Sequence, residues 1–324
     1  MAMARRRQAA DRTDTRGRPL LSQLSERATW LALPSTVILL VVVVVPVALG
    51  IYIAFFHLDV YNLRSLFSAP FAGIRNLVFV VTNGNTTTGT AVHAVGVSVA
   101  FAVLSTLVAT PIGALAALSV SHRSRGRAVL RSVYLVPYVI PVVVVATVGH
   151  VMFLNGTGLV DRVMGALGAS RNMYWLIGPN SFWAMLAVEI WIVWPFTYLL
   201  LLAGLAAVPE ELYEAAEIDG GKSLAKLRYV VFPEVRGLLL LSMVLSVIFH
   251  LGNFTLPYVM FTNPPPTAVQ VLPIAVYYQA FSNFQYGDAA ATGLFMMVIF
   301  AIPAAIYIRA TRLQRAIGVG GAAR

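Results

Sequence analysis

The sequence predicts an all-α integral membrane protein with about six transmembrane helices. Of its 324 residues, 59% are hydrophobic and only 11% are charged, whereas soluble domains carry roughly 25% charged residues. The mean hydropathy is +0.79. A hydrocarbon core of about 30 Å needs roughly 20 apolar residues in helical form. Six segments meet that requirement, at residues 30–56, 91–120, 129–153, 182–207, 237–261 and 289–309.

The first apolar segment is interpreted as an uncleaved spanning helix. The arginines at positions 5–7 resemble the basic start of a signal peptide, which is the alternative. However, the apolar run exceeds the usual 7–15 residues of such a peptide, and it lacks a clear cleavage site of small residues. The polar, arginine-rich residues 1–29 have little to bury and are predicted to be a disordered cytoplasmic tail.

The basic residues predict the orientation of the helices. With the N-terminus inside, all but four of the 23 lysines and arginines fall on the cytoplasmic side; the four outside are Arg64, Arg75, Arg162 and Arg171. This distribution follows the positive-inside rule. The net charge of +10 therefore indicates a lipid bilayer rather than nucleic acid as the partner. Both termini, including the tail at 311–324, are expected in the cytoplasm.

Several kinds of chemistry are excluded by composition. Cysteine is absent and the five histidines have no metal-ligand spacing, so no metal site is expected. Gly221-Lys222-Ser223 resembles the end of a phosphate-binding loop, but the glycine that this motif needs six residues before its lysine is Ala216. No cofactor is expected on this chain. A membrane-embedded enzyme would need a polar catalytic cluster, and the sequence shows none.

The cytoplasmic loop at 208–236 is too apolar for a solvated linker and too charged to cross the membrane. Two short amphipathic helices are predicted. The first begins at Pro209 with acidic residues in its first turns and stops at Gly220; the second begins near Lys222 and ends at Pro233. Leu212, Ala215 and Ala216 share one face of the first helix. From the residues alone, a connector packed on its own bundle and a helix that docks on a partner remain equally open.

The spacing within this loop resembles the EAA loop of permease subunits of bacterial ABC importers. Glu214-Ala215-Ala216 is followed after three residues by Gly220, and nine residues later by Val230-Val231-Phe232-Pro233. Further stretches resemble the carbohydrate group of these permeases. These stretches are Phe71, Gly73 and Asn76; Leu135-Val136-Pro137; Trp191 and Trp194-Pro195-Phe196; and Phe281 with Tyr286-Gly287.

The resemblance implies a type I ABC importer permease fold over residues 30–310. It also implies that the loop is a coupling helix, which docks on a separate ATPase subunit through Glu214, Ala215, Ala216, Asp219 and Gly220. ATP and Mg would then be bound by partner chains. The expected partners are a second permease in a heterodimer, two ATPase subunits and an extracytoplasmic solute-binding protein, in the bacterial cytoplasmic (inner) membrane.

The expected substrate is a sugar or a related neutral polyol or oligosaccharide. Aromatic faces and amide hydrogen bonds suit such a solute, and no lysine or arginine lies in the midplane of a span to hold an anion. The candidate pathway residues are Trp194, Tyr198, His250, Asn253, Phe254 and Tyr258. The alternatives are an ABC importer for another solute and an ion-coupled secondary carrier. Glu189, the one acid deep in a span, would serve such a carrier as a proton relay; we expect instead a hydrogen-bonded Glu that fixes helix packing.

Overall fold

The computed structural model describes residues 33–82, 90–121, 126–168, 173–261 and 263–321, with side chains up to Arg309. The predicted tail at 1–29 lies outside the described residues. Across the described part, the regular elements are all helices, and strand pairing is limited to two isolated bridges. The predicted all-α membrane fold is confirmed: the described residues include five apolar helices long enough to span a bilayer, or six if one bent helix pair is counted as a single span.

The chain divides into two units, 1–53 and 54–324. The described part of the first unit is one continuous apolar helix that ends at Ala54 (Leu33–Ala54). It includes a π-helical turn, η1 (Leu40–Val44), which is followed by α3 (Val45–Ala54). The wider π turn lies directly before Pro46, where a proline ring would otherwise clash with the preceding turn.

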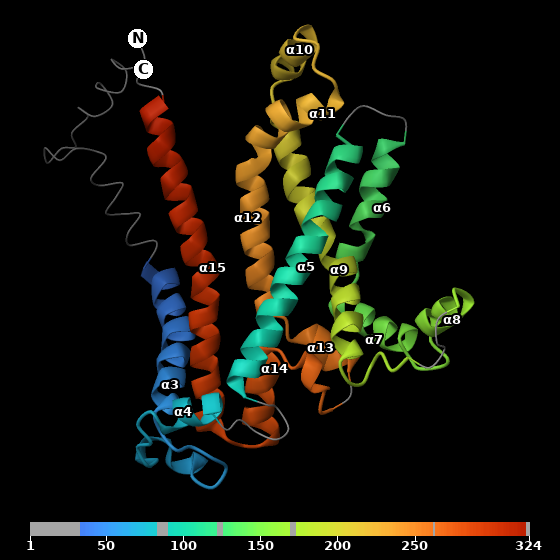
Figure 1. Ribbon diagram of the computed structural model, residues 1–324. Helices are drawn as coiled ribbons and strands as arrows, with labels where there is room; N and C mark the ends of the chain where they lie inside the picture. The colour runs from blue at the N-terminus through green and yellow to red at the C-terminus, as the bar shows by residue number, and fades with distance from the viewer. Residues whose placement is uncertain (1–32, 83–89, 122–125, 169–172, 262, 322–324) are drawn as a thin grey trace, which may run out of the picture. The chain divides into compact units, whose positions relative to one another are not determined.

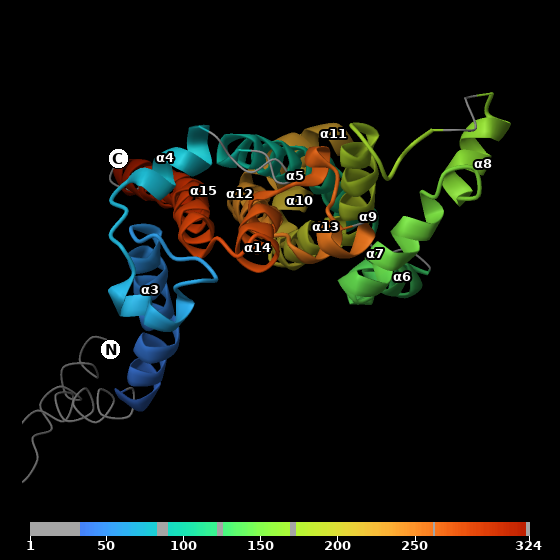
Figure 2. The same ribbon diagram turned by 90° about the horizontal axis from the view of Figure 1, so that it is seen from below.

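Two long helices form the centre of the second unit: α5 (Ala91–Ser119) and α9 (Asn180–Ala206). They cross closely at Gly113, where an added Cβ would lie 2.6 Å from the Trp194 carbonyl oxygen. The buried face of α5 is rich in small side chains, including Ala94, Ala102 and Ala109. Small residues let membrane helices approach each other, because packing replaces the hydrophobic effect inside lipid. Figures 1 and 2 show α12 (Phe232–Leu251) beside this pair.

The segment predicted as one span at 129–153 consists of two helices, which corrects that prediction. Helices α6 (Arg127–Val139) and α7 (Val142–Met152) meet at 84°. The break lies at Ile140 and Pro141, both of which have extended backbone angles. Proline has no N–H to donate and forces the preceding residue away from helical geometry. Hydropathy stays high across this break, so the apolar pattern alone did not reveal it.

The second helix of the cytoplasmic loop does not end at Pro233, contrary to the prediction. A π turn, η3 (Leu227–Val231), joins α11 (Ser223–Lys226) directly to α12. The result is one helical run from Ser223 to Leu251. The wide turn makes room for the ring of Pro233, as it does at Pro46.

The predicted fifth span at 237–261 is also corrected, because its helix stops at Leu251. A separate short helix, α13 (Thr255–Met260), follows Gly252. Asn253 starts it: its Oδ1 accepts a hydrogen bond from the Leu256 backbone N–H at 3.2 Å. The intrahelical donors at a helix start lack partners, so an asparagine side chain there favours a new helix.

The remaining elements complete the unit. The last span lies in α15, which begins three residues before the predicted start at 289 and continues through the predicted tail as far as Gly321. In α4 (Arg75–Thr82), the Asn76 side-chain amide donates hydrogen bonds to the carbonyl oxygens of Ala54 and Phe56, at 3.0 and 2.8 Å. These bonds hold α4 against the chain at residues 54–56. The other elements are η2 (Leu63–Ser68), α8 (Leu159–Ala166), η4 (Thr267–Val269), α14 (Leu272–Tyr277) and η5 (Tyr278–Ser282).

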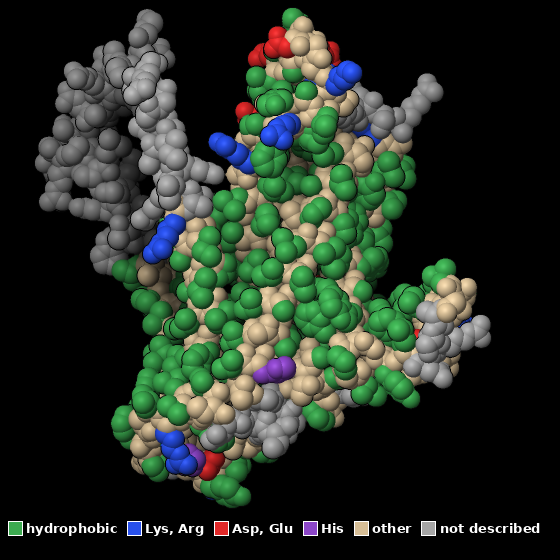
Figure 3. Space-filling view, in the orientation of Figure 1, with side chains coloured by type: hydrophobic (Ala, Val, Ile, Leu, Met, Phe, Trp, Pro, Cys, Tyr) green, Lys and Arg blue, Asp and Glu red, His purple; other side chains and the backbone are tan. Residues whose placement is uncertain are grey.

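Charged and apolar side chains are separated along the second unit. Figure 3 shows hydrophobic side chains over the middle of the helices, with acidic and basic side chains gathered at the end that carries α10 (Glu210–Ile218). Aliphatic residues such as Leu115 of α5 point outward, 66% exposed. Such an apolar belt between polar ends is what a lipid bilayer requires.

Candidate coupling and substrate sites

Helix α10 stands at one end of α9 and α12, and α13 and α14 lie at the opposite end (Figure 1). None of the nine residues of α10 is buried. Tyr213 and Ala216 are half-buried and face the unit, whereas Glu214 and Ala215 are exposed. The apolar side chains of Ile218 and, on α11, Leu224 are 87% and 76% exposed. An exposed apolar surface beside acidic residues is suited to contact with another protein.

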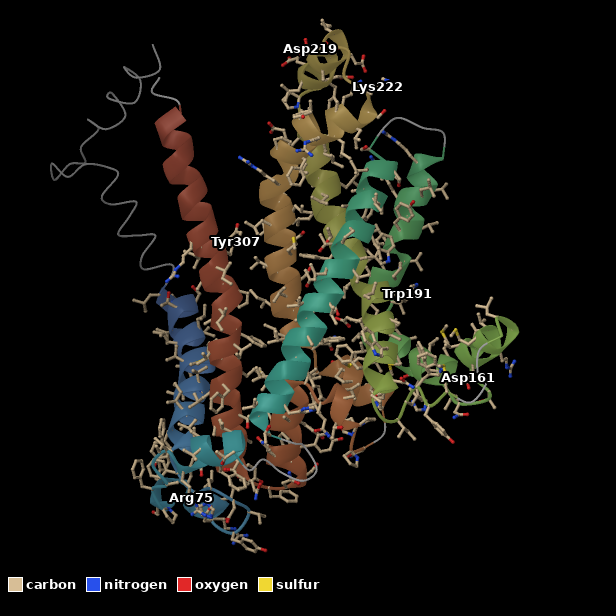
Figure 4. All side chains as sticks on the ribbon, in the orientation of Figure 1. Arg75, Asp161, Trp191, Asp219, Lys222 and Tyr307 are labelled. Atoms are coloured by element: carbon tan, nitrogen blue, oxygen red, sulfur yellow. The ribbon has the colours of Figure 1, made fainter. Side chains whose placement is uncertain are left out.

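The spacing between Ala216 and Gly220 is explained by the way α10 ends. Gly220 has φ of +74°, and its N–H donates to the Glu217 carbonyl at 2.9 Å. The Gly221 N–H donates to the Ala216 carbonyl at 2.8 Å. These two bonds form a Schellman motif, with Asp219 as the C-cap residue and Gly220 in the left-handed position. The motif turns the chain sharply, so that Asp219 and Lys222 lie at the tip of the loop (Figure 4).

An ion pair between Glu217 of α10 and Lys226 of α11 closes the loop. The hydrogen bond and charge of Lys226 hold the pKa of the exposed Glu217 carboxyl below its usual value. Gly221 is a further structural residue that the motif did not single out: an added Cβ would lie 2.7 Å from the Ala216 carbonyl oxygen. The five predicted coupling residues therefore lie together on one short, exposed element.

A polar cavity of about 530 Å³ separates α10 from the ends of α6 and α9. Arg127 and Lys226 contribute positive charges to its lining, and Glu210 and Glu217 contribute negative ones. Beside this cavity, Tyr213 of α10 packs against the hydrophobic core that joins α5, α6 and α9.

The structure brings Glu189 together with His250 and Asn253, two of the predicted pathway residues. Glu189 of α9 is 3% exposed and His250 of α12 is 2% exposed. His250 Nδ1 lies 2.8 Å from Glu189 Oε1, and Asn253 Nδ2 donates to Glu189 Oε2 at 2.8 Å. We call Glu189, His250 and Asn253 the polar triad. The expectation that Glu189 is hydrogen-bonded is confirmed: His250 belongs to α12, and Asn253 lies between α12 and α13. That these bonds fix the packing of α9 against α12 stays a prediction.

Part of the triad's hydrogen-bonding capacity remains unused among the described residues. His250 Nε2 is buried without a partner there, and the Phe101 ring lies 6.3 Å from the imidazole between ring centroids. A buried imidazole with one spare nitrogen can donate to, or accept from, a group brought to it. The triad is therefore a polar site within an apolar bundle.

Two of the predicted pathway residues lie elsewhere, which corrects their grouping with the triad. Trp194 and Tyr198 pack edge-on against Tyr134 of α6, at 5.5 and 5.6 Å between ring centroids. Tyr198 is fully buried in the core that joins α5, α6 and α9. Its ring is enclosed by the side chains of this core and packs α6 against α9. Helical spacing placed these residues on the same span but could not show which face was buried.

The other two, Phe254 and Tyr258 of α13, stack on each other with ring centroids 4.9 Å apart. Tyr277 of α14 contacts both rings, at 5.2 and 5.1 Å. Phe281 of η5 contacts Tyr277 at 5.1 Å. We call Phe254, Tyr258, Tyr277 and Phe281 the aromatic cluster. Sequence reasoning missed the last two as pathway candidates, because they lie beyond the fifth predicted span.

Comparison with known proteins identifies the chain. Residues 109–315, well over half of it, match the model of the family described as "Binding-protein-dependent transport system inner membrane component". The chain belongs to this family. The match includes α10, the polar triad and the aromatic cluster. As members of a binding-protein-dependent transport family, such chains are membrane components of ABC importers and not enzymes.

Individual relatives agree with this assignment. The chain is 30% identical to the trehalose/maltose transport system permease protein MalF of Thermococcus litoralis, over 87% of this chain and 92% of that protein. It is 27% identical to the sulfoquinovosyl glycerol transport system permease protein SmoG of Agrobacterium fabrum, over 89% and 91%. Its fold is similar to that of a bacterial alginate ABC transporter in complex with alginate pentasaccharide-bound periplasmic protein, with a TM-score of 0.72 at 19% identity, over 92% of this chain and 98% of that one.

Proposed function

We propose that this chain is a sugar-conducting permease subunit of an ABC importer, which carries a neutral sugar, polyol or oligosaccharide inward by alternating access. Two of its relatives, a trehalose/maltose permease and a maltodextrin permease, support the substrate class. The triad and the aromatic cluster supply what a neutral polyhydroxylated solute needs, namely amide and imidazole hydrogen bonds and aromatic faces.

In this proposal α10 is the coupling helix. Glu214 and Ala215 present its exposed face to a cleft on an ATPase subunit, and the Schellman turn at Asp219 and Gly220 fixes the angle at which the helix meets that cleft. ATP and Mg are bound by the ATPase subunits. The observation that carries the proposal is this exposed helix, closed by the motif that the Glu-Ala-Ala…Gly spacing predicts.

The proposed assembly pairs this permease with a second, different permease, two ATPase subunits and an extracytoplasmic binding protein. The chain lies in the cytoplasmic membrane with α10 and both termini in the cytoplasm. Two features support this orientation: the basic residues gather on the α10 side, and α15 ends on that side as well (Figure 1).

The test is to purify the chain with the products of neighbouring genes, reconstitute them in liposomes and measure trehalose, maltose and maltodextrin uptake together with ATP hydrolysis. The double variant Glu214→Lys, Gly220→Val should lower uptake by at least about tenfold, the effect of losing one good interface contact. Hydrolysis by the ATPase subunits should persist. Glu234→Lys, an exposed acid outside α10, is the control and should transport normally.

Wild-type uptake by the double variant would overturn the coupling assignment. Uptake that needs an ion gradient but no ATPase subunit would favour the ion-coupled carrier instead, with Glu189 as its ionisable group. ATP-driven uptake of another solute, with all three sugars rejected, would overturn the substrate class alone.

A further inference from the structure

The aromatic cluster is built as a rigid platform with an exposed front. Phe254 and Tyr277 are half-buried and pack against the main hydrophobic core. Tyr258 and Phe281 stand in front of them, 39% and 65% exposed. The rings of Tyr277 and Phe281 are inclined by only 34°. A half-buried ring beside an exposed one, with similar orientation, offers a broad aromatic face, whereas the surfaces of the long helices are mostly aliphatic.

The short helices beneath the cluster are tied to the long ones by hydrogen bonds. His150 Nδ1 of α7 lies 2.7 Å from the Met260 carbonyl oxygen at the end of α13. At the start of α14, the Leu272 N–H donates to the buried Ser98 hydroxyl of α5 at 2.7 Å. A platform that is fixed before its ligand arrives loses little conformational freedom on binding.

The two phenols give this apolar face a polar edge. The hydroxyl oxygens of Tyr258 and Tyr277 lie 3.2 Å apart, and either can be the donor. The phenol that accepts this hydrogen bond can still donate its own O–H to a ligand. The phenol that donates it can still accept a hydrogen bond through its oxygen lone pairs. The four side chains carry no charge at neutral pH. A neutral molecule with a flat apolar face and hydroxyls at its rim matches this surface.

The cluster is continuous with the polar triad. Phe254 directly follows Asn253, whose amide donates to Glu189. Phe249 of α12, which directly precedes His250, is 61% exposed and contacts Phe196 of α9 edge-on at 5.8 Å. Aromatic residues therefore directly precede His250 and directly follow Asn253 in the chain.

We propose that Tyr258, Tyr277 and Phe281 form a second sugar subsite, separate from the polar triad, in which one pyranose ring of an oligosaccharide stacks on Tyr277 and Phe281. The hydroxyls of Tyr258 and Tyr277 hold the rim of that ring. The subsite lies at the end of the pathway opposite the coupling helix. It rests on the proposed sugar transport function and deepens it, because it assigns one pyranose ring of an oligosaccharide to this exposed aromatic face.

The experiment uses the assembled transporter in lipid nanodiscs or liposomes, with maltotriose as the probe. Phe281→Leu and Tyr277→Leu remove aromatic faces but keep apolar bulk, and Tyr277→Phe keeps the face but removes a hydroxyl. With saturating loaded binding protein, each Leu variant should lower maltotriose delivered per ATP hydrolysed roughly tenfold, which matches the loss of one stacked aromatic contact. Tyr277→Phe should retain most of that ratio. Phe67→Leu, at a 78% exposed ring of η2, is the matched control and should behave as wild type.

Saturation-transfer NMR provides a readout that a packing defect does not imitate. Maltotriose C–H protons should receive saturation from the wild-type complex, and one ring should lose it in Phe281→Leu. Because Phe281 is largely exposed, this variant is expected to assemble even if Tyr277→Leu does not. Unchanged transport and unchanged saturation in Phe281→Leu would overturn the subsite while leaving sugar transport intact. Failure of the wild type to transport any sugar would overturn both proposals.

Discussion

Helix α10, the proposed coupling helix, and the polar triad are held in place by opposite means. Backbone geometry defines α10: no residue of it is buried, and its end is fixed by two main-chain hydrogen bonds and a glycine at φ +74°. Side chains define the triad: Glu189 is almost completely buried, and it bonds to residues 61 and 64 positions away. A local motif tolerates a loose environment, whereas a buried polar group depends on every one of its partners.

The largest effect is expected from Glu189→Leu. This change leaves His250 Nδ1 and Asn253 Nδ2 facing an apolar side chain, and a buried polar group without its partner costs about 3 kcal/mol. Thermal unfolding of the solubilised complex should show this loss. Glu214→Leu on exposed α10 is the control and should stay within about 0.5 kcal/mol of wild type. Equal stability of the two variants would mean that the triad does not hold α9 against α12.

A matched pair of glycine substitutions sharpens the comparison. Gly113→Ala places a Cβ 2.6 Å from the Trp194 carbonyl oxygen, where α5 and α9 cross. The backbone must move, at a cost of about 3 kcal/mol. At Gly220 an added Cβ meets nothing within 4 Å, so Gly220→Ala incurs only the left-handed backbone penalty of about 1 kcal/mol.

The control for this pair is Gly237→Ala, because a Cβ at that position of α12 also meets nothing within 4 Å and its φ lies outside the left-handed region. This variant should be as stable as wild type or slightly more stable, since alanine favours helix. We expect the loss of stability to be largest for the alanine variant at Gly113, smaller at Gly220 and smallest at Gly237. A Gly220→Ala variant less stable than Gly113→Ala would contradict it.

The smallest effect concerns the ion pair of Glu217 and Lys226. Because the folded loop lowers the pKa of Glu217, the pair stabilises the loop at pH values above the usual glutamate range and ceases to do so as pH falls through the lowered pKa. Wild type and Lys226→Met should therefore differ slightly in thermal stability at neutral pH and converge in acid, below the usual glutamate range. Lys222→Met removes the same charge from a neighbouring position and provides the control. If wild type and Lys226→Met still differed in thermal stability in acid, the ion pair of Glu217 and Lys226 could not be the cause of the difference.

Prediction from sequence succeeded where the signal is local. The long apolar runs located α5 and α9 to within two residues, and the Glu-Ala-Ala…Gly spacing located the end of α10, because hydropathy and helix-end chemistry depend on neighbours in the chain. The breaks at Pro141 and Gly252 were missed because the flanking residues remain apolar. The triad and the Tyr277–Phe281 platform were missed because nothing near Glu189 or Tyr258 in the sequence identifies partners on other helices.

The unbroken helical run from Ser223 to Leu251 has a mechanical consequence. At 1.5 Å per residue its 29 residues make a rod of roughly 40 Å, with the tip of the loop at one end and His250 at the other. Its neighbour α9 extends from Asn180 to Ala206, and α10 begins shortly after it at Glu210. The same two helices therefore carry the loop at one end and Glu189 and His250 towards the other, which gives a displacement of α10 a continuous helical path to the triad.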